Sequence, residues 1–229
     1  MRHETAQLYL AAGVDRDGVE RNLHALAATI PGLRGMQVGR NLVGCWGAGD
    51  YTIDLQLDAD APHAAGAARL AQLPGVSRAD HVSYRRLGGG RRAADLQHGL
   101  WRTLMFSVRP QVNAEQRAAL ERDLLRMPRY MPGIRNWQLS RVTSDSCWSH
   151  VWQQEFDCVD DLLGEYLMHP FHWGWVDRWF DPECPEWMVT AISHAFCPLD
   201  ASILSLPGTL AEMPIRTWCR NFQQLIDEV

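Results

Sequence analysis

The hydrophobic and polar positions of the chain follow two periods, which together predict an alternation of strands and helices. In the C-terminal half, apolar residues recur at helical spacing over 114–126. Residues 148–156 alternate as in a strand, with His150, Trp152, Gln154 and Phe156 on one face. The expected elements of this half are strands at 101–108, 137–142, 148–156 and 186–192, and helices at 114–126 and 159–168. Their order is the ferredoxin-like split pattern.

A repeat relates this half to the N-terminal half. Residues 30–37 (IPGLRGMQ) match residues 131–138 (MPGIRNWQ) at an offset of 101 residues, and Arg40 matches Arg141 at the same offset. A shared offset across several elements predicts two copies of one fold. We therefore expect an α+β chain of two tandem ferredoxin-like units, at 1–90 and 91–190. Their open sheet faces would meet as an intramolecular pseudo-dimeric barrel.

Two further segments have their own character. Residues 85–92, rich in arginine and glycine, are expected to form a solvated linker between the units. Residues 191–229 are expected to be a C-terminal extension, with an amphipathic helix at 216–229.

Composition narrows the chemistry that is available. The 229 residues include no lysine, and all 22 basic residues are arginine. This excludes Schiff-base lysine catalysis and the phosphate-loop nucleotide triphosphatases. A net charge of −5 argues against nucleic-acid binding. No apolar signal region or membrane-length run is present, and the six cysteines lack zinc-finger spacing. The sequence thus predicts a cytoplasmic protein with reduced thiols and no membrane partner.

The most specific stretch follows the second predicted helix of the C-terminal half. Tyr166, His169 and His172 lie around Pro170 in the pattern Y-x-x-H-P-x-H. Proline disfavours helical geometry in the residue before it, so the helix is expected to end at His169. His172 would then lie in a loop that aims its ring into the barrel. This motif and the element order resemble the stress-responsive A/B barrel (Dabb) domain family over about residues 100–190.

The resemblance implies a ferredoxin-like unit that dimerises into an α+β barrel, in a family that includes cofactor-independent polyketide cyclases. Carried over from the cyclases, His172 is the general base and Tyr166 is the hydrogen-bond donor. His150 is a third catalytic candidate because of its place on the strand face. This chain departs from the family pattern by fusing two units and by one apparent extra residue between Phe156 and Tyr166.

Other residues around the motif are candidates for contact with a substrate, namely Trp152, Thr103, His169, Phe171 and Trp173. In the N-terminal copy, Leu70, Leu73 and Val76 stand at the places of the motif tyrosine and the two histidines. One pocket per chain is therefore expected, in the C-terminal unit.

These observations predict a cofactor-independent acid–base enzyme of lyase, cyclase or isomerase type, acting on a small aromatic or polyketide-like substrate in the barrel cavity. The alternatives are a non-enzymatic, stress-related small-molecule-binding protein and a cofactor-free aromatic monooxygenase. No cofactor is expected. Metal binding by Glu165, His169 and His172 lacks a convincing further ligand, and haem ligation through His172 or His150 is a minor alternative. The fused pseudo-dimers could also associate as a homodimer.

Overall fold

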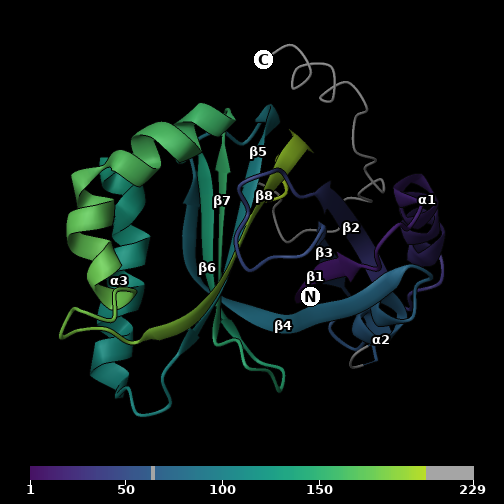
Figure 1. Ribbon diagram of the computed structural model, residues 1–229, viewed down its shortest axis with the longest axis horizontal. Coiled ribbons are helices and arrows are strands. Elements are labelled where there is room, and N and C mark those ends of the chain that lie inside the picture. Colours follow the sequence, from purple (N-terminus) through teal and green to yellow (C-terminus); the bar gives the residue numbers. More distant parts are fainter. Residues whose placement is uncertain (63–64, 205–229) are drawn as a thin grey trace.

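In the part of the chain that the structure describes, eight antiparallel strands form one curled sheet (Figure 1). The computed structural model describes residues 1–62 and 65–204, so the helix predicted at 216–229 lies outside them. The strands are β1 (Arg2–Leu10), β2 (Leu33–Arg40), β3 (Tyr51–Leu57), β4 (Val76–Arg91), β5 (Gln97–Val108), β6 (Asn136–Val142), β7 (His150–Phe156) and β8 (Val189–Ala201). Their order in the sheet is β2-β3-β1-β4-β6-β7-β5-β8.

Helices cover the two opposite outer sides of this sheet (Figure 1). The helices are α1 (Arg16–Ala27), α2 (Ala65–Ala71) and α3 (Ala114–Tyr130), and three shorter turns follow, η1 (Asp161–Tyr166), η2 (His172–Val176) and η3 (Asp177–Trp179). Asn113 starts α3 with a capping box that it forms with Gln116. None of the described helices has the length and apolar character needed to cross a bilayer.

The two halves of the sheet repeat one strand order. The first four strands lie as β2-β3-β1-β4 and the last four as β6-β7-β5-β8, with β4 paired to β6 between them. This is the strand order of a ferredoxin-like unit in each half. The predicted α+β ferredoxin-like fold is therefore confirmed, while the division of the chain into tandem units stays a prediction.

The arginine- and glycine-rich run at 85–92 was wrongly expected to be a linker. It is the end of β4, which pairs with β6 as far as Arg91 opposite Asn136. The glycines make this pairing possible because neighbouring groups pass very close to them. Gly90 lies against the ring of Trp137, where a Cβ atom would collide.

The last strand starts later and runs further than expected. It was predicted at 186–192, but β8 extends from Val189 to Ala201, because β5 pairs with it from Gln97 to Val108. The expected boundary between 190 and 191 therefore falls inside a strand, and residues 191–201 belong to the sheet rather than to an extension.

Each half has its own apolar core, and a smaller apolar cluster with buried hydrogen bonds joins the halves. Leu8, Leu23 and Ile53 belong to the first core, and Leu120 and Trp152 belong to the second. Between the halves, Val82, Tyr84, Met105 and Val151 pack together. Asp54 of β3 accepts hydrogen bonds there from the Tyr84 hydroxyl at 2.7 Å and from Gln153 Nε2 at 3.0 Å.

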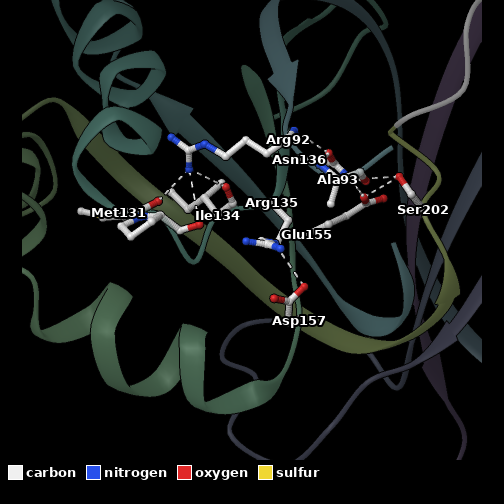
Figure 2. Close-up of polar contacts among 10 residues, drawn as sticks. Arg92, Ala93, Met131, Ile134, Arg135, Asn136, Glu155, Asp157 and Ser202 are labelled. Atoms are coloured by element: carbon white, nitrogen blue, oxygen red, sulfur yellow. Dashed lines mark hydrogen bonds and ion pairs between the residues drawn. The ribbon is translucent and has the colours of Figure 1, made fainter. Parts of the chain in front are cut away.

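An exposed arginine and a buried glutamate fix the ends of segments in the second half (Figure 2). Arg92 donates to the carbonyl oxygens of Met131 and Ile134, and so holds the chain that leaves α3. Glu155, fully buried on β7, accepts from Asn136 Nδ2 at 2.7 Å and from Ser202 Oγ at 2.6 Å. Its other carboxylate oxygen accepts from the backbone N–H groups of residues 203 and 204. The segment after β8 is thereby pinned to the sheet.

Candidate functional site

A pocket of about 250 Å³ lies between the sheet of the second half and the elements that cover it. It therefore lies outside the barrel interior where the sequence placed it. The walls are mainly apolar and aromatic, among them Trp46, Leu104, Leu124, Trp152, Phe180 and Ile192. The polar lining residues are Arg102, Tyr166, His172, Asp177 and His194. A largely apolar pocket with a few convergent polar groups is typical of a small-molecule site.

Tyr166 and His172 lie on the same wall, as the motif predicted. Their ring centroids are 4.8 Å apart and the rings meet edge to face. Tyr166 is 2% exposed, and its hydroxyl lies 3.9 Å from the sulfur of Met127, a weak acceptor. Burial raises the pKa of Tyr166, although the charge of Arg102 opposes the rise. The hydroxyl is therefore protonated at neutral pH and can donate a hydrogen bond.

The local fold around the motif differs from the expected helix and loop. Residues 159–168 are helical, but η1 within them is wound as a π-helix, and His172 opens a second π-helical turn, η2, rather than lying in a loop. A π-helical turn holds more residues than an α-helical turn and is common at functional sites. It accommodates the apparent extra residue before Tyr166.

Asp177 provides a carboxylate for His172. Nδ1 of His172 lies 3.4 Å from Oδ1 of Asp177, within ion-pair distance but outside hydrogen-bond geometry. The carboxylate favours the tautomer with the proton on Nδ1, which leaves the lone pair on Nε2. The pair resembles the acid–histidine arrangement that orients a general base.

Arg102 and His194 form the second polar pair of the pocket. Nε of Arg102 donates to Nε2 of His194 at 2.8 Å, and the guanidinium carbon lies 5.1 Å from the centre of the Tyr166 ring. Burial and the charges of Arg102 and His172 lower the pKa of His194 to about 3. His194 is therefore neutral at pH 7, and the nitrogen that could take a proton is already occupied.

The first half of the chain also contributes to the pocket. Trp46, in the connection between β2 and β3, exchanges backbone hydrogen bonds with His194 at 2.8 and 2.9 Å, and 64% of its surface is exposed. Gly47 has a φ of +62°, and a Cβ atom there would lie 2.6 Å from the carbonyl oxygen of Ile192. A glycine is needed for this close approach. The connection is thus built to hold Trp46 against the second half.

His150 does not line the pocket. Its ring is 1% exposed and stacks on Phe106 with centroids 4.7 Å apart. Nε2 lies 3.0 Å from a carboxylate oxygen of Glu121, and Nδ1 lies 2.8 Å from the Ser149 hydroxyl. The strand face was predicted correctly, but His150 is the first residue of β7, two residues before Trp152, and neighbouring side chains satisfy both of its nitrogens there.

Of the five predicted substrate contacts, Trp152 lines the pocket and the other four do not. Thr103 is buried on the face of β5 opposite to Arg102. Nδ1 of His169 accepts the backbone N–H of Phe171 at 3.1 Å, a structural role. Phe171 stacks outward on Tyr130, and Trp173 is 61% exposed.

The sequence reasoning missed Arg102, Asp177, His194 and Trp46. Arg102 is the neighbour of Thr103, so the two side chains lie on opposite faces of β5. The sequence analysis chose the wrong face, because the register between β5 and β7 decides which one lines the pocket. His194 was missed because residues after 190 were assigned to the extension. Asp177 could have been identified from the sequence, because it is an acidic residue only five positions after His172. No sequence signal links Trp46 to this pocket.

The fold and the site together define an α+β barrel protein with a pocket between the sheet and the helices of its second half. Residues 100–193 match the family described as the stress responsive A/B barrel domain. A search of curated proteins found no match. Within the described ranges, no group of three His, Cys, Asp or Glu side chains is placed to hold a metal ion.

Solved structures with the same fold align over most of the chain. An anthrone oxidase-like protein has a TM-score of 0.59 at 10% identity, covering 91% of this chain and 97% of the other. A proposed monooxygenase from Fusobacterium nucleatum has a TM-score of 0.56 at 8% identity, covering 87% and 92%. A proposed chlorite dismutase has a TM-score of 0.51 at 13% identity, covering 90% and 98%. At these identities the likeness concerns the fold alone.

Proposed function

We propose that the pocket catalyses cofactor-independent proton transfer on a small aromatic or polyketide-like carbonyl compound, in a reaction of lyase, cyclase or isomerase type. The observation that carries the proposal is the pairing of His172 and Tyr166 on one pocket wall, with Asp177 beside the histidine. A base and a hydrogen-bond donor at one wall are what enolisation next to a carbonyl requires.

His172 is the general base. It lines the pocket, and Asp177 orients it and would stabilise the imidazolium that forms when it takes a proton. His194 cannot serve instead, because its pKa is about 3 and Arg102 already donates to it. His150, the third candidate from the sequence, is excluded from the reaction in this proposal because it bonds to Glu121 outside the pocket.

Tyr166 donates to the oxygen on which negative charge develops. Its raised pKa keeps the hydroxyl protonated, and a thioether is its acceptor in this structure. An incoming carbonyl oxygen is a much stronger acceptor than sulfur, and it becomes stronger still as it turns into an enolate. The hydroxyl therefore favours the transition state over the ground state.

The size of the pocket limits the substrate. A dry cavity of about 150 Å³ is enough for benzene, so about 250 Å³ accommodates one substituted aromatic ring. Flat side chains such as Trp152 and Phe180 provide walls for such a ring.

The test is deuterium incorporation into phenylpyruvate, a single-ring carbonyl compound with acidic C–H bonds, followed by NMR in D₂O. We expect faster exchange with the protein than with buffer. His172→Ala should reduce the enzymatic rate about 10²- to 10⁴-fold, and Tyr166→Phe should also reduce it. His169→Ala is the matched control, a motif histidine outside the pocket, and should exchange like the wild type. Full activity of His172→Ala would refute the mechanism.

The two alternative functions give different readings in the same assay. Saturable binding of phenylpyruvate without accelerated exchange would favour the binding protein. Consumption of O₂ that depends on the aromatic compound would favour the cofactor-free monooxygenase, whose reaction starts from the same deprotonation.

We also propose that the two halves are fused copies of one unit, with the catalytic pocket in the second. The repeated strand order and the common offset of 101 residues support this. An experimental structure in which residues 1–87 and 97–201 fail to superpose would contradict it. Light scattering would test association into a homodimer.

A further inference from the structure

Arg102 is a buried positive charge without a negatively charged partner among the described residues. Its side chain lines the pocket, yet the residue is only 4% exposed. Nε donates to His194 and Nη1 donates to the side-chain oxygen of Gln154, and both acceptors are neutral. Across residues 1–62 and 65–204, no aspartate or glutamate forms an ion pair with it. A buried charge that lacks a counter-charge is unfavourable, so the free pocket favours binding of an anion.

Two N–H groups beside Arg102 have no acceptor in good hydrogen-bond geometry among the described residues, and the only group they act on is the neutral Tyr166 hydroxyl. Nε1 of Trp152 and Nε2 of Gln154 are buried, and neither makes a hydrogen bond among the described residues. Both side chains lie near the Tyr166 hydroxyl, where they lower the pKa of Tyr166 as donors would. Arg102, Trp152 and Gln154 therefore supply one charge and two poorly satisfied donors to the region around the Tyr166 hydroxyl. Buried donors left without acceptors are costly unless a ligand provides oxygen atoms.

In the first half of the chain, the position equivalent to Arg102 holds a buried charge that is paired within the protein. Pairing across the strands gives the row Val38, Ile53, Ala6 and His81 in the first half, and the row Leu139, Trp152, Leu104 and His194 in the second. Val38 and Leu139 are 101 residues apart, the offset of the repeat. His81 therefore corresponds to His194, and Glu4, two residues before Ala6, corresponds to Arg102.

In that first-half position the buried charge has its counter-ion. Glu4 is fully buried, and its carboxylate bonds to Arg2 Nε at 2.8 Å and to His81 Nε2 at 2.7 Å. In the second half, His194 takes the position of His81, and the positively charged Arg102 takes the position of Glu4. No described residue supplies an opposite charge to Arg102 as Arg2 does to Glu4. The missing partner is thus specific to the half that has the pocket.

We propose that this pocket binds organic anions, and that a carboxylate of the substrate is the counter-ion of Arg102, with Trp152 and Gln154 as further donors. As a statement about the substrate this rests on the proposed function, whereas anion binding itself is testable without turnover. Asp177 lies beside His172, so the carboxylate would be anchored on the arginine side and the reacting carbon presented to the histidine. Arginine is suited to bidentate carboxylate recognition.

The first experiment compares benzoate with benzamide, which has the same shape without the charge, by titration calorimetry on the full chain. We expect benzoate to bind about 10- to 100-fold more tightly, the range for one charge-assisted interaction. Equal affinity for the two compounds, or no binding of benzoate, would overturn the proposal.

The second experiment supplies the missing counter-charge. Gln154→Glu is nearly isosteric and keeps an oxygen for Arg102, so it should fold at least as stably as the wild type. We expect it to weaken benzoate binding at least tenfold and to leave benzamide binding unchanged. Gln97→Glu, which adds the same charge at an exposed position of β5, is the control and should bind benzoate like the wild type. Wild-type benzoate affinity in Gln154→Glu would overturn the proposal.

The outcomes separate this proposal from the catalytic one. Benzoate binding that persists in His172→Ala and in Tyr166→Phe, without deuterium exchange in any variant, would count against the proton-transfer function alone. Exchange without any preference for anions would count against the anion site alone.

Discussion

Asp54 is expected to make the protein less stable as the pH rises, and Asp54→Asn to remove this effect. The carboxyl group lies between the two halves and is 6% exposed. Burial raises its pKa from 3.8 to about 7, although Tyr84 and Gln153 donate hydrogen bonds to it. Asparagine keeps an oxygen that can accept both bonds, so the substitution changes the charge with little change in shape.

The magnitude follows from the two pKa values of Asp54. The unfolded chain releases this proton near pH 4, whereas the folded chain keeps it until about pH 7. Between these values the folded state binds more protons, so the free energy of unfolding falls by about 1.4 kcal/mol per pH unit and levels off above pH 7. The full effect is about 4 kcal/mol, an upper estimate because the buried site can relax. Asp54→Asn should match the wild type near pH 4 and exceed it by several kcal/mol at pH 8.

Urea unfolding followed by tryptophan fluorescence at pH 4.5, 6 and 8 measures this difference. Asp58→Asn is the control, because the Arg34 side chain lowers the pKa of that partly exposed carboxyl group, and no gain in stability at high pH is expected there. A stability difference between Asp54→Asn and wild type that is the same at all three pH values would refute the reasoning.

Three other substitutions test single features of the structure. His150→Gln should leave deuterium exchange unchanged and lower the free energy of unfolding by about 1–3 kcal/mol, since Glu121 loses a partner; loss of exchange in a folded variant would restore His150 to the catalytic set. Trp46→Ala should weaken benzoate binding several-fold in calorimetry while the variant stays folded, whereas an unchanged Kd would show that the first half adds nothing to the pocket. Glu155→Gln should lower the free energy of unfolding in urea by about 1–3 kcal/mol, because an amide offers one acceptor oxygen where Ser202 and three other donors need two; wild-type stability would contradict this.

Local patterns predicted most of the elements correctly. The helix expected at 114–126 is α3, which continues to Tyr130, and the strands expected at 137–142 and 148–156 correspond to β6 and β7. These segments are predictable because each buries one face, and the period of the apolar residues follows from that burial. The same reasoning failed at 85–92, where a run of glycine and arginine has no such period and is held as a strand by β6.

Three of the thirteen residues that line the pocket, Trp152, Tyr166 and His172, were predicted from the sequence. Tyr166 and His172 were identified because the Y-x-x-H-P-x-H motif resembles that of the Dabb family, and the proline within it explains only why the helix was expected to end there. Thr103 was chosen in place of Arg102 because a strand that is buried on both faces shows no alternation to reveal which face lines the pocket. His150 is on the strand face that lines the pocket, but it lies at the first position of β7, beyond the pocket. The sequence does not show how far a pocket extends along a strand.

The sequence by itself determined the ferredoxin-like order of elements, the absence of lysine chemistry and the residues of the motif, because these depend on composition and on spacing within one segment. Only the tertiary structure decided that the pocket lies outside the barrel interior, that Trp46 reaches it from the first half, and that Arg102 meets His194 there rather than a carboxylate. These contacts depend on the register between strands that are far apart in the chain, and a shift of one residue would turn each side chain to the other face.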